Sequence, residues 1–260
     1  MSPESAPALP PSLPPLEAKP EQPHMGEAAR LAGVFFSPGK AFADIARRPR
    51  WWIPVILLAI LGTVYLNAFT QRVGWESVIR QALEKSPQGQ NMTSQQREQA
   101  ITVGATVYKY LGYGGSAVGT LFYVFIVAVI LMFLFDTMMS AGVGLKRMMA
   151  IVAYGFLPLV IQTILSMVVL YLKDPEEFNL QNPLMFNVGA YLSPDTPAAL
   201  RALGSSIDLF SLWIIVLLAI GVSAAARKIS AGKAFTAIAC SWALFVCAKV
   251  GLAAAGLYNS

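Results

Sequence analysis

Three ionisable side chains, those of Asp136, Asp208 and Lys249, lie inside or at the ends of long apolar stretches of the sequence. A charge inside a bilayer is costly, so such residues often belong to ion or proton pathways, or pair with one another. We expect Asp208 and Lys249 to lie in the same half of the membrane, where they could form an ion pair. Asp136 could pair with Lys146 or Arg147. Structural roles, including a Lys249 side chain that snorkels to the interface, are the favoured alternatives.

Few other residues have the type or spacing of a catalytic or metal site. Cys240 and Cys247 are seven residues apart on one expected helix, about 10 Å along its axis, which is too far for a mutual disulfide bond. The single histidine, His24, lies in a proline-rich tail. Glu76 and Glu84 lie among basic residues in a polar loop, which favours a solvated surface over a catalytic carboxylate pair. We therefore predict a non-enzymatic protein with no cofactor and no metal.

The composition is that of a membrane protein. The chain has 260 residues, of which 56% are hydrophobic and 13% charged, and its mean hydropathy is +0.57. Soluble domains carry about 25% charged residues. The formal net charge of +5 lies mainly in turns and flanks, so it indicates membrane topology and no binding to nucleic acid.

Five apolar stretches are long enough to cross the hydrocarbon core as helices, which takes about 20 residues. We therefore predict an all-α fold: a polytopic membrane helix bundle with five transmembrane helices and short interfacial amphipathic helices. The spans are expected at residues 51–68, 115–135, 148–172, 207–226 and 234–257, in one membrane domain over 51–257. Pro158 should kink the third span. Tyr154, Pro158 and Gln162 are its polar or hinge candidates, and Gln162 and Asn67 are expected to hydrogen-bond across helices.

Residues 1–25 are proline-rich and predict a disordered tail. Residues 26–50 predict an amphipathic segment in the headgroup region, with Ser37 as a helix cap before Pro38. Phe42 and Ile45 fall on one side of that helix, and a basic cluster falls on the other side or beyond its end. The cluster would favour anionic lipid, and the two tryptophans mark the interface. The candidate lipid-surface residues are Lys40, Phe42, Arg47, Arg48, Arg50, Trp51 and Trp52.

The long loop after the first span contains two predicted helices. Apolar residues at helical spacing indicate an amphipathic helix over 74–84. Thr93, with Gln96 three residues later, has the pattern of a capping box and predicts a helix over 94–110. The stretch Gly112-Tyr113-Gly114-Gly115 is expected to be a flexible connection to the second span. Residues 197–203 predict one or two helical turns before the fourth span.

The distribution of Lys and Arg predicts the orientation. The N-terminal segment, the turn after the second span and the turn after the fourth span carry most of the basic residues near span ends. The positive-inside rule places these three segments in the cytoplasm. Both long loops and the C-terminus are then expected outside it.

One motif near the N-terminus is Phe36-Ser37-Pro38-Gly39-Lys40-Ala41-Phe42 with Arg48-Pro49-Arg50-Trp51-Trp52 before the first span. A second is Ala153-Tyr154-Gly155-Phe156-Leu157-Pro158, and a third is Leu209-Phe210-Ser211-Leu212-Trp213 with Leu217-Leu218-Ala219-Ile220-Gly221 and then Gly232-Lys233-Ala234. Together these motifs resemble the Yip (Ypt-interacting protein) domain family of five-span membrane proteins, in its bacterial form, over about residues 31–256. Eukaryotic relatives act in vesicle trafficking and contact small GTPases of the Rab type. The Asp-Leu-Tyr-Gly-Pro motif of those relatives is absent, so the resemblance does not imply GTPase contact.

Two hypotheses on function follow. The first is a non-enzymatic membrane protein, multi-pass in the bacterial cell membrane, that acts through membrane-protein interaction or membrane organisation. Its expected partners are membrane lipids, mainly anionic ones, and other membrane proteins. The alternative is a small transporter, channel or lipid-scrambling conduit that uses the Pro158 kink, Gln162, Asp208 and Lys249. Neither hypothesis fixes an oligomeric state.

Overall fold

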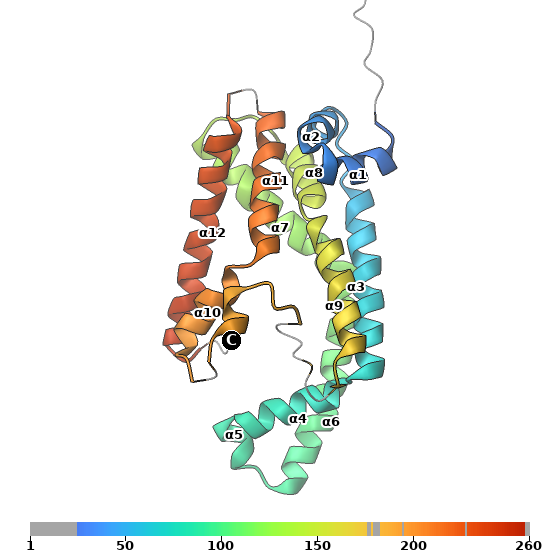
Figure 1. Cartoon of the computed structure of the whole chain (residues 1–260), viewed down its shortest axis with the longest axis vertical. Helices are drawn as coiled ribbons and strands as arrows, with labels where there is room; N and C mark the ends of the chain where they lie inside the picture. The colour runs from blue at the N-terminus through green and yellow to red at the C-terminus, as the bar shows by residue number, and fades with distance from the viewer. Residues whose placement is uncertain (1–24, 176–177, 179–182, 194, 227, 258–260) are drawn as a thin grey trace, which may run out of the picture.

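Long apolar helices run roughly side by side along the longest axis of the molecule (Figure 1). The computed structural model describes residues 25–257 except 176–177, 179–182, 194 and 227. Within these residues, four helical segments are long and apolar enough to cross a membrane, and α11 (Leu209–Ala225) is a shorter apolar helix. The predicted all-α polytopic bundle is therefore confirmed. The four segments are α3 (Trp52–Arg72), Thr120–Met138, Leu145–Leu172 and α12 (Ala231–Ala254).

The spanning helices bury only part of their surface within the protein. Between 17% and 33% of the residues in their most apolar windows are buried. Large apolar side chains such as Ile60, Phe122 and Leu244 point outward, with exposed fractions of 59%, 62% and 72%. A helix that is apolar on all sides fits lipid on its outer faces and protein on its inner face. The long apolar stretches of the sequence therefore indicate that lipid surrounds each span. They say little about which face of a span packs against other helices.

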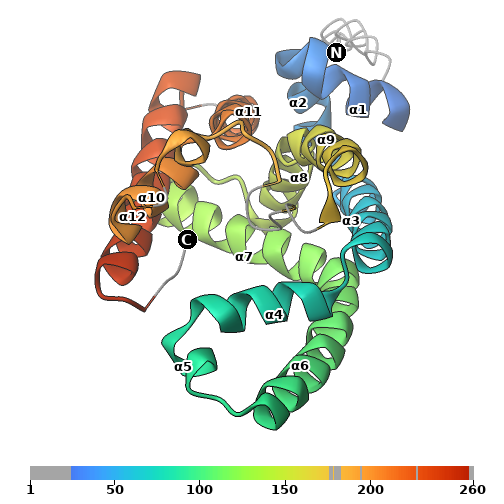
Figure 2. The ribbon, with the colours of Figure 1, turned by 60° about the horizontal axis from the view of Figure 1, so that its bottom comes forward.

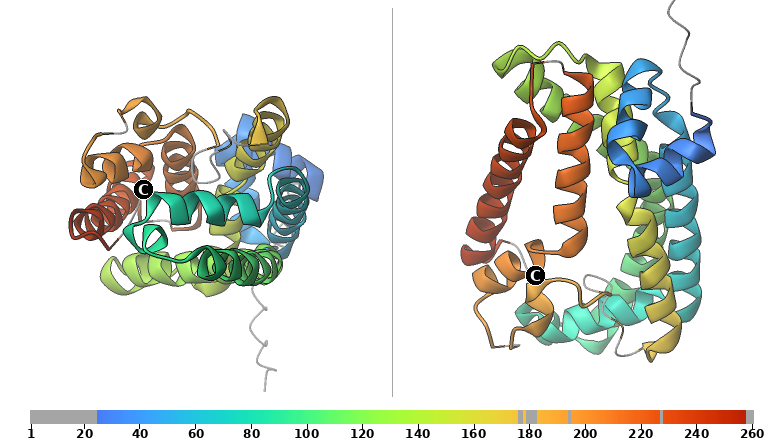
Figure 3. Two further views of the ribbon diagram at one scale, coloured as in Figure 1. Left: turned by 90° about the horizontal axis from the view of Figure 1, so that it is seen from below. Right: turned by 45° about the horizontal axis from the view of Figure 1, so that its top comes forward.

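The two ends of the bundle carry different elements. Helices α1 (Glu27–Phe36) and α2 (Pro38–Arg47) lie at one end, together with the connections from the second to the third span and from α11 to α12 (Figures 1 and 3). The opposite end carries α4 (Trp75–Lys85), α5 (Pro87–Gln90), the start of α6 (Ser94–Gly114), η4 (Val188–Tyr191) and α10 (Ala198–Ser206). The segments expected in the cytoplasm thus share one end of the molecule.

Local signals in the first long loop are confirmed. The Thr93 hydroxyl accepts the N–H of Gln96, and the Gln96 side chain accepts the N–H of Thr93, which completes the predicted capping box. The predicted amphipathic helix is α4, which lies across the end of the bundle against α6 (Figure 2). Asn67 accepts a hydrogen bond from the Tyr113 hydroxyl at 3.2 Å, the interhelical contact that was expected.

The glycine-rich stretch before the second span was expected to be flexible, and that expectation is wrong. Helix α6 continues through the π-helical turn η1 (Gly115–Gly119) into α7 (Thr120–Met132) and a second π-helical turn, η2 (Phe133–Met138). The Ser116 hydroxyl lies 3.0 Å from the Thr63 hydroxyl of α3. A π-turn keeps the backbone helical while shifting its register. A Cβ atom at Gly112 would lie 3.2 Å from Cδ2 of Leu66, so this glycine allows close packing against α3.

The third span is broken at the predicted position. Helix α8 (Leu145–Gly155) ends three residues before Pro158, which is the first residue of α9 (Pro158–Leu172). Proline cannot donate a backbone hydrogen bond, which explains the break. A Cβ atom at Gly155 would lie 2.6 Å from Cδ2 of Leu218, so α8 and α11 approach closely just before the turn.

Predicted tail residues 1–24 lie outside the described residues. The predicted segment 26–50 contains two helices, because α1 precedes α2 and the chain bends at Ser37. Ser37 lies at the start of α2 as predicted, but its side chain makes no capping hydrogen bond. Its backbone N–H bonds to the carbonyl of Gly33 instead.

Candidate functional site

Phe42 faces the protein interior and is fully buried in the main hydrophobic core. A Cβ atom at Gly221 would lie 3.0 Å from Cδ1 of Phe42 and 2.6 Å from Cγ2 of Ile151. The ring therefore lies directly against the backbone of α11. The prediction that Phe42 belongs to the lipid surface is wrong, because the apolar face of α2 is covered by α8 and α11.

A buried guanidinium joins the two N-terminal helices. The side chain of Arg30 is only 2% exposed. Its Nε donates to Oδ2 of Asp44 at 2.7 Å, and its Nη1 donates to Oε1 of Glu27 at 3.1 Å and to the carbonyl of Arg48 at 3.2 Å. Arg30 thus connects the start of α1 to the middle and the end of α2.

The same network reaches the third span. The Tyr154 hydroxyl, on α8, donates to Oε2 of Glu27 at 2.7 Å. Arg50, which is 57% exposed, donates to Oε1 of Glu27 at 3.1 Å. One carboxylate thereby receives hydrogen bonds from α1, from α8 and from the chain that leads into α3. We call Glu27, Arg30, Asp44 and Tyr154 the anchoring network.

Sequence reasoning singled out Tyr154 but missed the other three members of this network. A signal was present: Arg30 lies four residues before Val34, on the buried face of α1, and Glu27 lies one turn earlier, at a spacing where side chains meet. Burial acts to lower the pKa of Arg30, but the hydrogen bond and charge of Asp44, with the charge of Glu27, raise that pKa above its ordinary value. An arginine side chain is protonated in proteins, so Asp44 and Glu27 face a full positive charge.

The outer side of the N-terminal helices carries basic and aromatic residues. Lys40 and Arg47 are exposed and lie seven residues apart on α2, opposite its buried face. Trp51 is half-buried, whereas Phe36 is 85% exposed. We call the exposed set the basic ledge; it comprises Phe36, Lys40, Arg47, Arg48, Arg50 and Trp52.

Asp136 stabilises a turn at the same end of the molecule. Its carboxylate accepts the backbone N–H groups of Val143 and Gly144 at 2.8 and 2.7 Å. Gly142 and Gly144 have φ values of 66° and 78°, a region that favours glycine. The expected partners, Lys146 and Arg147, are exposed on α8. The carboxylate therefore shapes the connection into the third span.

Asp208 and Lys249 lie near the same level of the bundle but have different partners. The Asp208 carboxylate caps α11 by accepting the N–H groups of Phe210 and Ser211, and it also accepts the Ser211 hydroxyl. Lys249 Nζ donates to the hydroxyls of Ser205 and Ser206 at 3.1 and 3.0 Å. These serines end α10, where a helix dipole favours a cation. Gln162 is partly buried on α9.

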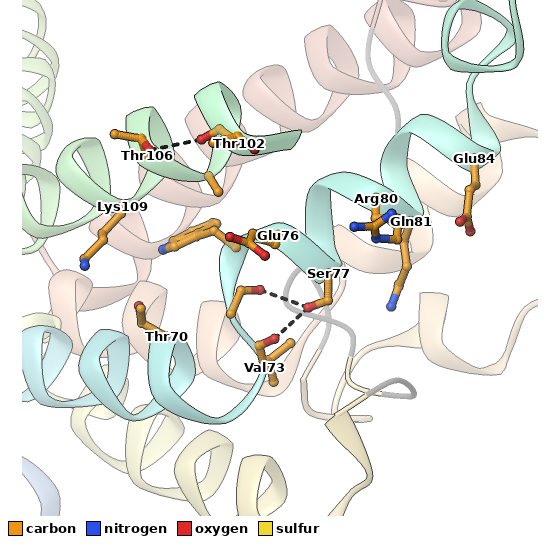
Figure 4. Close-up of a pocket in the computed structure, with 13 residues that line it drawn as sticks. Thr70, Val73, Glu76, Ser77, Arg80, Gln81, Glu84, Thr102, Thr106 and Lys109 are labelled. Atoms are coloured by element: carbon orange, nitrogen blue, oxygen red, sulfur yellow. Dashed lines mark hydrogen bonds between the residues drawn. The ribbon is translucent and has the colours of Figure 1, made fainter. Parts of the chain in front are cut away.

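A pocket of about 1040 Å³ with mixed polar and apolar walls lies at the opposite end, between α4 and α6 (Figure 4). Its walls come from the end of α3, the exposed face of α4 and one stripe of α6. The pocket lies beside the ends of two spans. Arg72, the last residue of α3, joins these ends by donating to the carbonyls of Leu170, Tyr171 and Lys173 at the end of α9. Its lining includes Thr70, Glu76, Arg80, Glu84 and Lys109.

Comparisons with known proteins identify the family. The sequence profile described as the Yip1 domain matches residues 32–252. The chain is 28% identical over 197 residues to "Membrane protein YknW" of Bacillus subtilis strain 168, which covers 75% of this chain and 78% of that protein. No solved structure matches the chain significantly. The profile spans the N-terminal helices and nearly the whole membrane bundle, so the chain belongs to the Yip1 domain family of membrane proteins.

Proposed function

We propose that the protein is a non-enzymatic membrane organiser that binds anionic lipids, and through them or beside them other membrane proteins, at the basic ledge. The observation that carries this proposal is that the ledge is exposed while the helices that bear it are fixed to the bundle by the anchoring network. The proposed location is the bacterial cytoplasmic membrane, with the ledge on the cytoplasmic side.

Two physical effects support this function. Each Lys or Arg near an anionic leaflet contributes about 1 kcal/mol of attraction, and an aromatic side chain such as Trp52 is favoured at the headgroup level. The anchoring network holds α1 and α2 in place before any lipid binds. Binding therefore costs little ordering of the backbone, which favours a stable shell of anionic lipid around this end of the bundle.

Charge reversal at the ledge tests the proposal. Lys40→Glu should weaken retention of phosphatidylglycerol by about 1–2 kcal/mol, since an attraction is lost and a repulsion added. Native mass spectrometry of the protein released from mixed phosphatidylglycerol and phosphatidylcholine nanodiscs would count the retained lipids. Lys173→Glu makes the same charge change at the opposite end, outside the basic ledge, and should lower the count less than Lys40→Glu does. Equal retention by all three proteins would contradict the proposal.

The alternative function, a conduit for a small solute or a lipid, is favoured by the break at Pro158 in the third span. A broken helix in a bundle can mark a substrate path. Under our proposal, vesicles that contain the purified protein show no ion, solute or lipid flux above protein-free vesicles. A flux that Lys249→Met abolishes and Lys173→Met preserves would overturn the proposal in favour of the conduit.

A further inference from the structure

Among the residues that the structure describes, the pocket between α4 and α6 presents charged side chains that are not paired with another part of the protein. Lys109 and Glu76 are both exposed, from α6 and α4, and both line the pocket (Figure 4). Neither side chain takes part in a hydrogen bond or ion pair with the other residues that the structure describes. By contrast, Arg80 in the same wall lies 3.7 Å from Glu98. Glu84, farther along α4, is a second exposed carboxylate of the lining whose side chain has no partner among those residues. The pocket therefore offers one cation, Lys109, and two carboxylates to a ligand.

The pocket also contains polar atoms that are buried without a partner. Oγ1 of Thr70 and Nε1 of Trp75 make no hydrogen bond in the described part of the chain, and both residues line the pocket. A buried donor left without an acceptor costs about 1–3 kcal/mol. The Trp75 ring packs between two other aromatic rings: its centroid lies 5.1 Å from that of Phe69 and 5.7 Å from that of Tyr108. If a small movement of the side chains let an acceptor atom of a ligand reach Nε1 of Trp75, the new hydrogen bond would offset the free-energy cost of that movement.

The level of the pocket in the membrane narrows the ligand class. Thr70 and Val73 belong to the end of the α3 span, and Arg72 between them binds the last carbonyls of α9. This is where the hydrocarbon core gives way to lipid headgroups. Val73, Trp75 and Ala105 add apolar surface to the wall. A ligand with a polar zwitterionic group and an adjoining apolar part matches this lining.

We propose that the pocket between α4 and α6 binds an amine-bearing phosphodiester, the headgroup chemistry of phosphatidylethanolamine, with its phosphate at Lys109 and its ammonium at Glu76. The ligand differs from the anionic lipid proposed for the basic ledge, and the site lies at the other end of the bundle. The primary ammonium can donate hydrogen bonds to a carboxylate, whereas the quaternary ammonium of phosphatidylcholine cannot. Charge-assisted hydrogen bonds of this kind provide selectivity between the two headgroups.

Native mass spectrometry of the full chain in detergent tests this inference. The protein is incubated with equal amounts of dioctanoyl phosphatidylethanolamine, phosphatidylcholine and phosphatidylglycerol. We expect phosphatidylethanolamine to bind most, and Lys109→Met and Glu76→Gln each to weaken its binding about tenfold, the loss of one charge-assisted contact. The matched controls Lys173→Met and Asp174→Asn, exposed beyond the end of α9, should bind like the unmodified protein.

A competition experiment distinguishes a soluble ligand from a membrane lipid. Glycerophosphoethanolamine has the same headgroup without acyl chains. If it displaces the lipid at equal concentration, the headgroup alone accounts for binding and a soluble phosphodiester is a sufficient ligand; if it does not, the acyl chains contribute and the ligand is a membrane lipid. Both outcomes support the headgroup chemistry. Equal binding of phosphatidylethanolamine and phosphatidylcholine, or pocket variants that bind like their controls while melting at the same temperature, would overturn it. Phosphatidylglycerol retention by Lys40→Glu reports on the ledge alone, so the two proposals fail separately.

Discussion

Replacement of Arg30 by methionine is expected to lower the free energy of unfolding by about 3–5 kcal/mol, the usual cost of removing one partner from a buried ion pair. The guanidinium is 2% exposed and holds Asp44 at 2.7 Å. Methionine fills similar space but leaves the Asp44 carboxylate, itself only 13% exposed, without its charged partner. The carbonyl of Arg48 loses the donor that Arg30 supplies. We therefore expect α1 and α2 to detach from the bundle before the spans unfold.

Thermal unfolding in detergent, followed by limited proteolysis at the N-terminal helices, would measure this effect. Arg50→Met is the matched control, because Arg50 binds the same Glu27 carboxylate but is 57% exposed. Exposed ion pairs contribute at most about 1 kcal/mol, so the control should melt near the unmodified protein. Equal, small effects of the two variants would show that the network does not hold the helices.

Phe42→Ala is expected to destabilise the protein by about 3–5 kcal/mol, as is typical when a buried phenylalanine is truncated. The ring is fully buried and contacts the surface of α11 at Gly221. Loss of the ring would leave a cavity between α2, α8 and α11 that the glycine backbone cannot fill. The proportion of folded protein after extraction should fall accordingly.

Phe36→Ala provides the comparison, since Phe36 is six residues earlier and 85% exposed. It should change unfolding by no more than about 0.5 kcal/mol. Its effect should appear instead in lipid retention, because the side chain lies on the basic ledge. The same denaturation experiment distinguishes the two positions. If Phe36→Ala were the more damaging variant, the burial of Phe42 against α11 would be contradicted.

Sequence alone could predict the membrane class, the all-α architecture and the helices of the first long loop. Apolar length identifies the spans, because a spanning helix must satisfy its backbone within itself. The capping box at Thr93 is equally readable, because both of its hydrogen bonds join residues three apart in sequence. Pro158 marked the helix break for a comparable reason, the loss of one local donor. All of these signals are local.

The role of the N-terminal helices could not be read in the same way. The spacing of Phe42 and Ile45 shows that α2 has an apolar face, but it does not show whether lipid or protein covers that face. Only the packing of α2 against α11 decides the question. The anchoring network joins residues as far apart as Glu27 and Tyr154, and no spacing rule within one helix connects them.

Asp136 and Asp208 illustrate another limit. Counting charges near each residue suggested ion pairs, yet both carboxylates bind backbone N–H groups of the nearby chain. Short acidic side chains commonly bind local backbone in this way. The choice depends on turn geometry, which the positive φ values of Gly142 and Gly144 establish at Asp136. A pattern of charges does not contain that geometry.

Helix α11 has only 17 residues between its Asp208 cap and Ala225, so it rises about 25 Å at 1.5 Å per residue. A typical hydrocarbon core is about 30 Å thick. Beside α11 the bilayer must therefore become thinner, or water and headgroups must descend to the level of Asp208 and α10. Such mismatch costs a fraction of a kcal/mol for each ångström. We therefore expect the protein to be favoured in thin regions of a bilayer over thick, ordered ones.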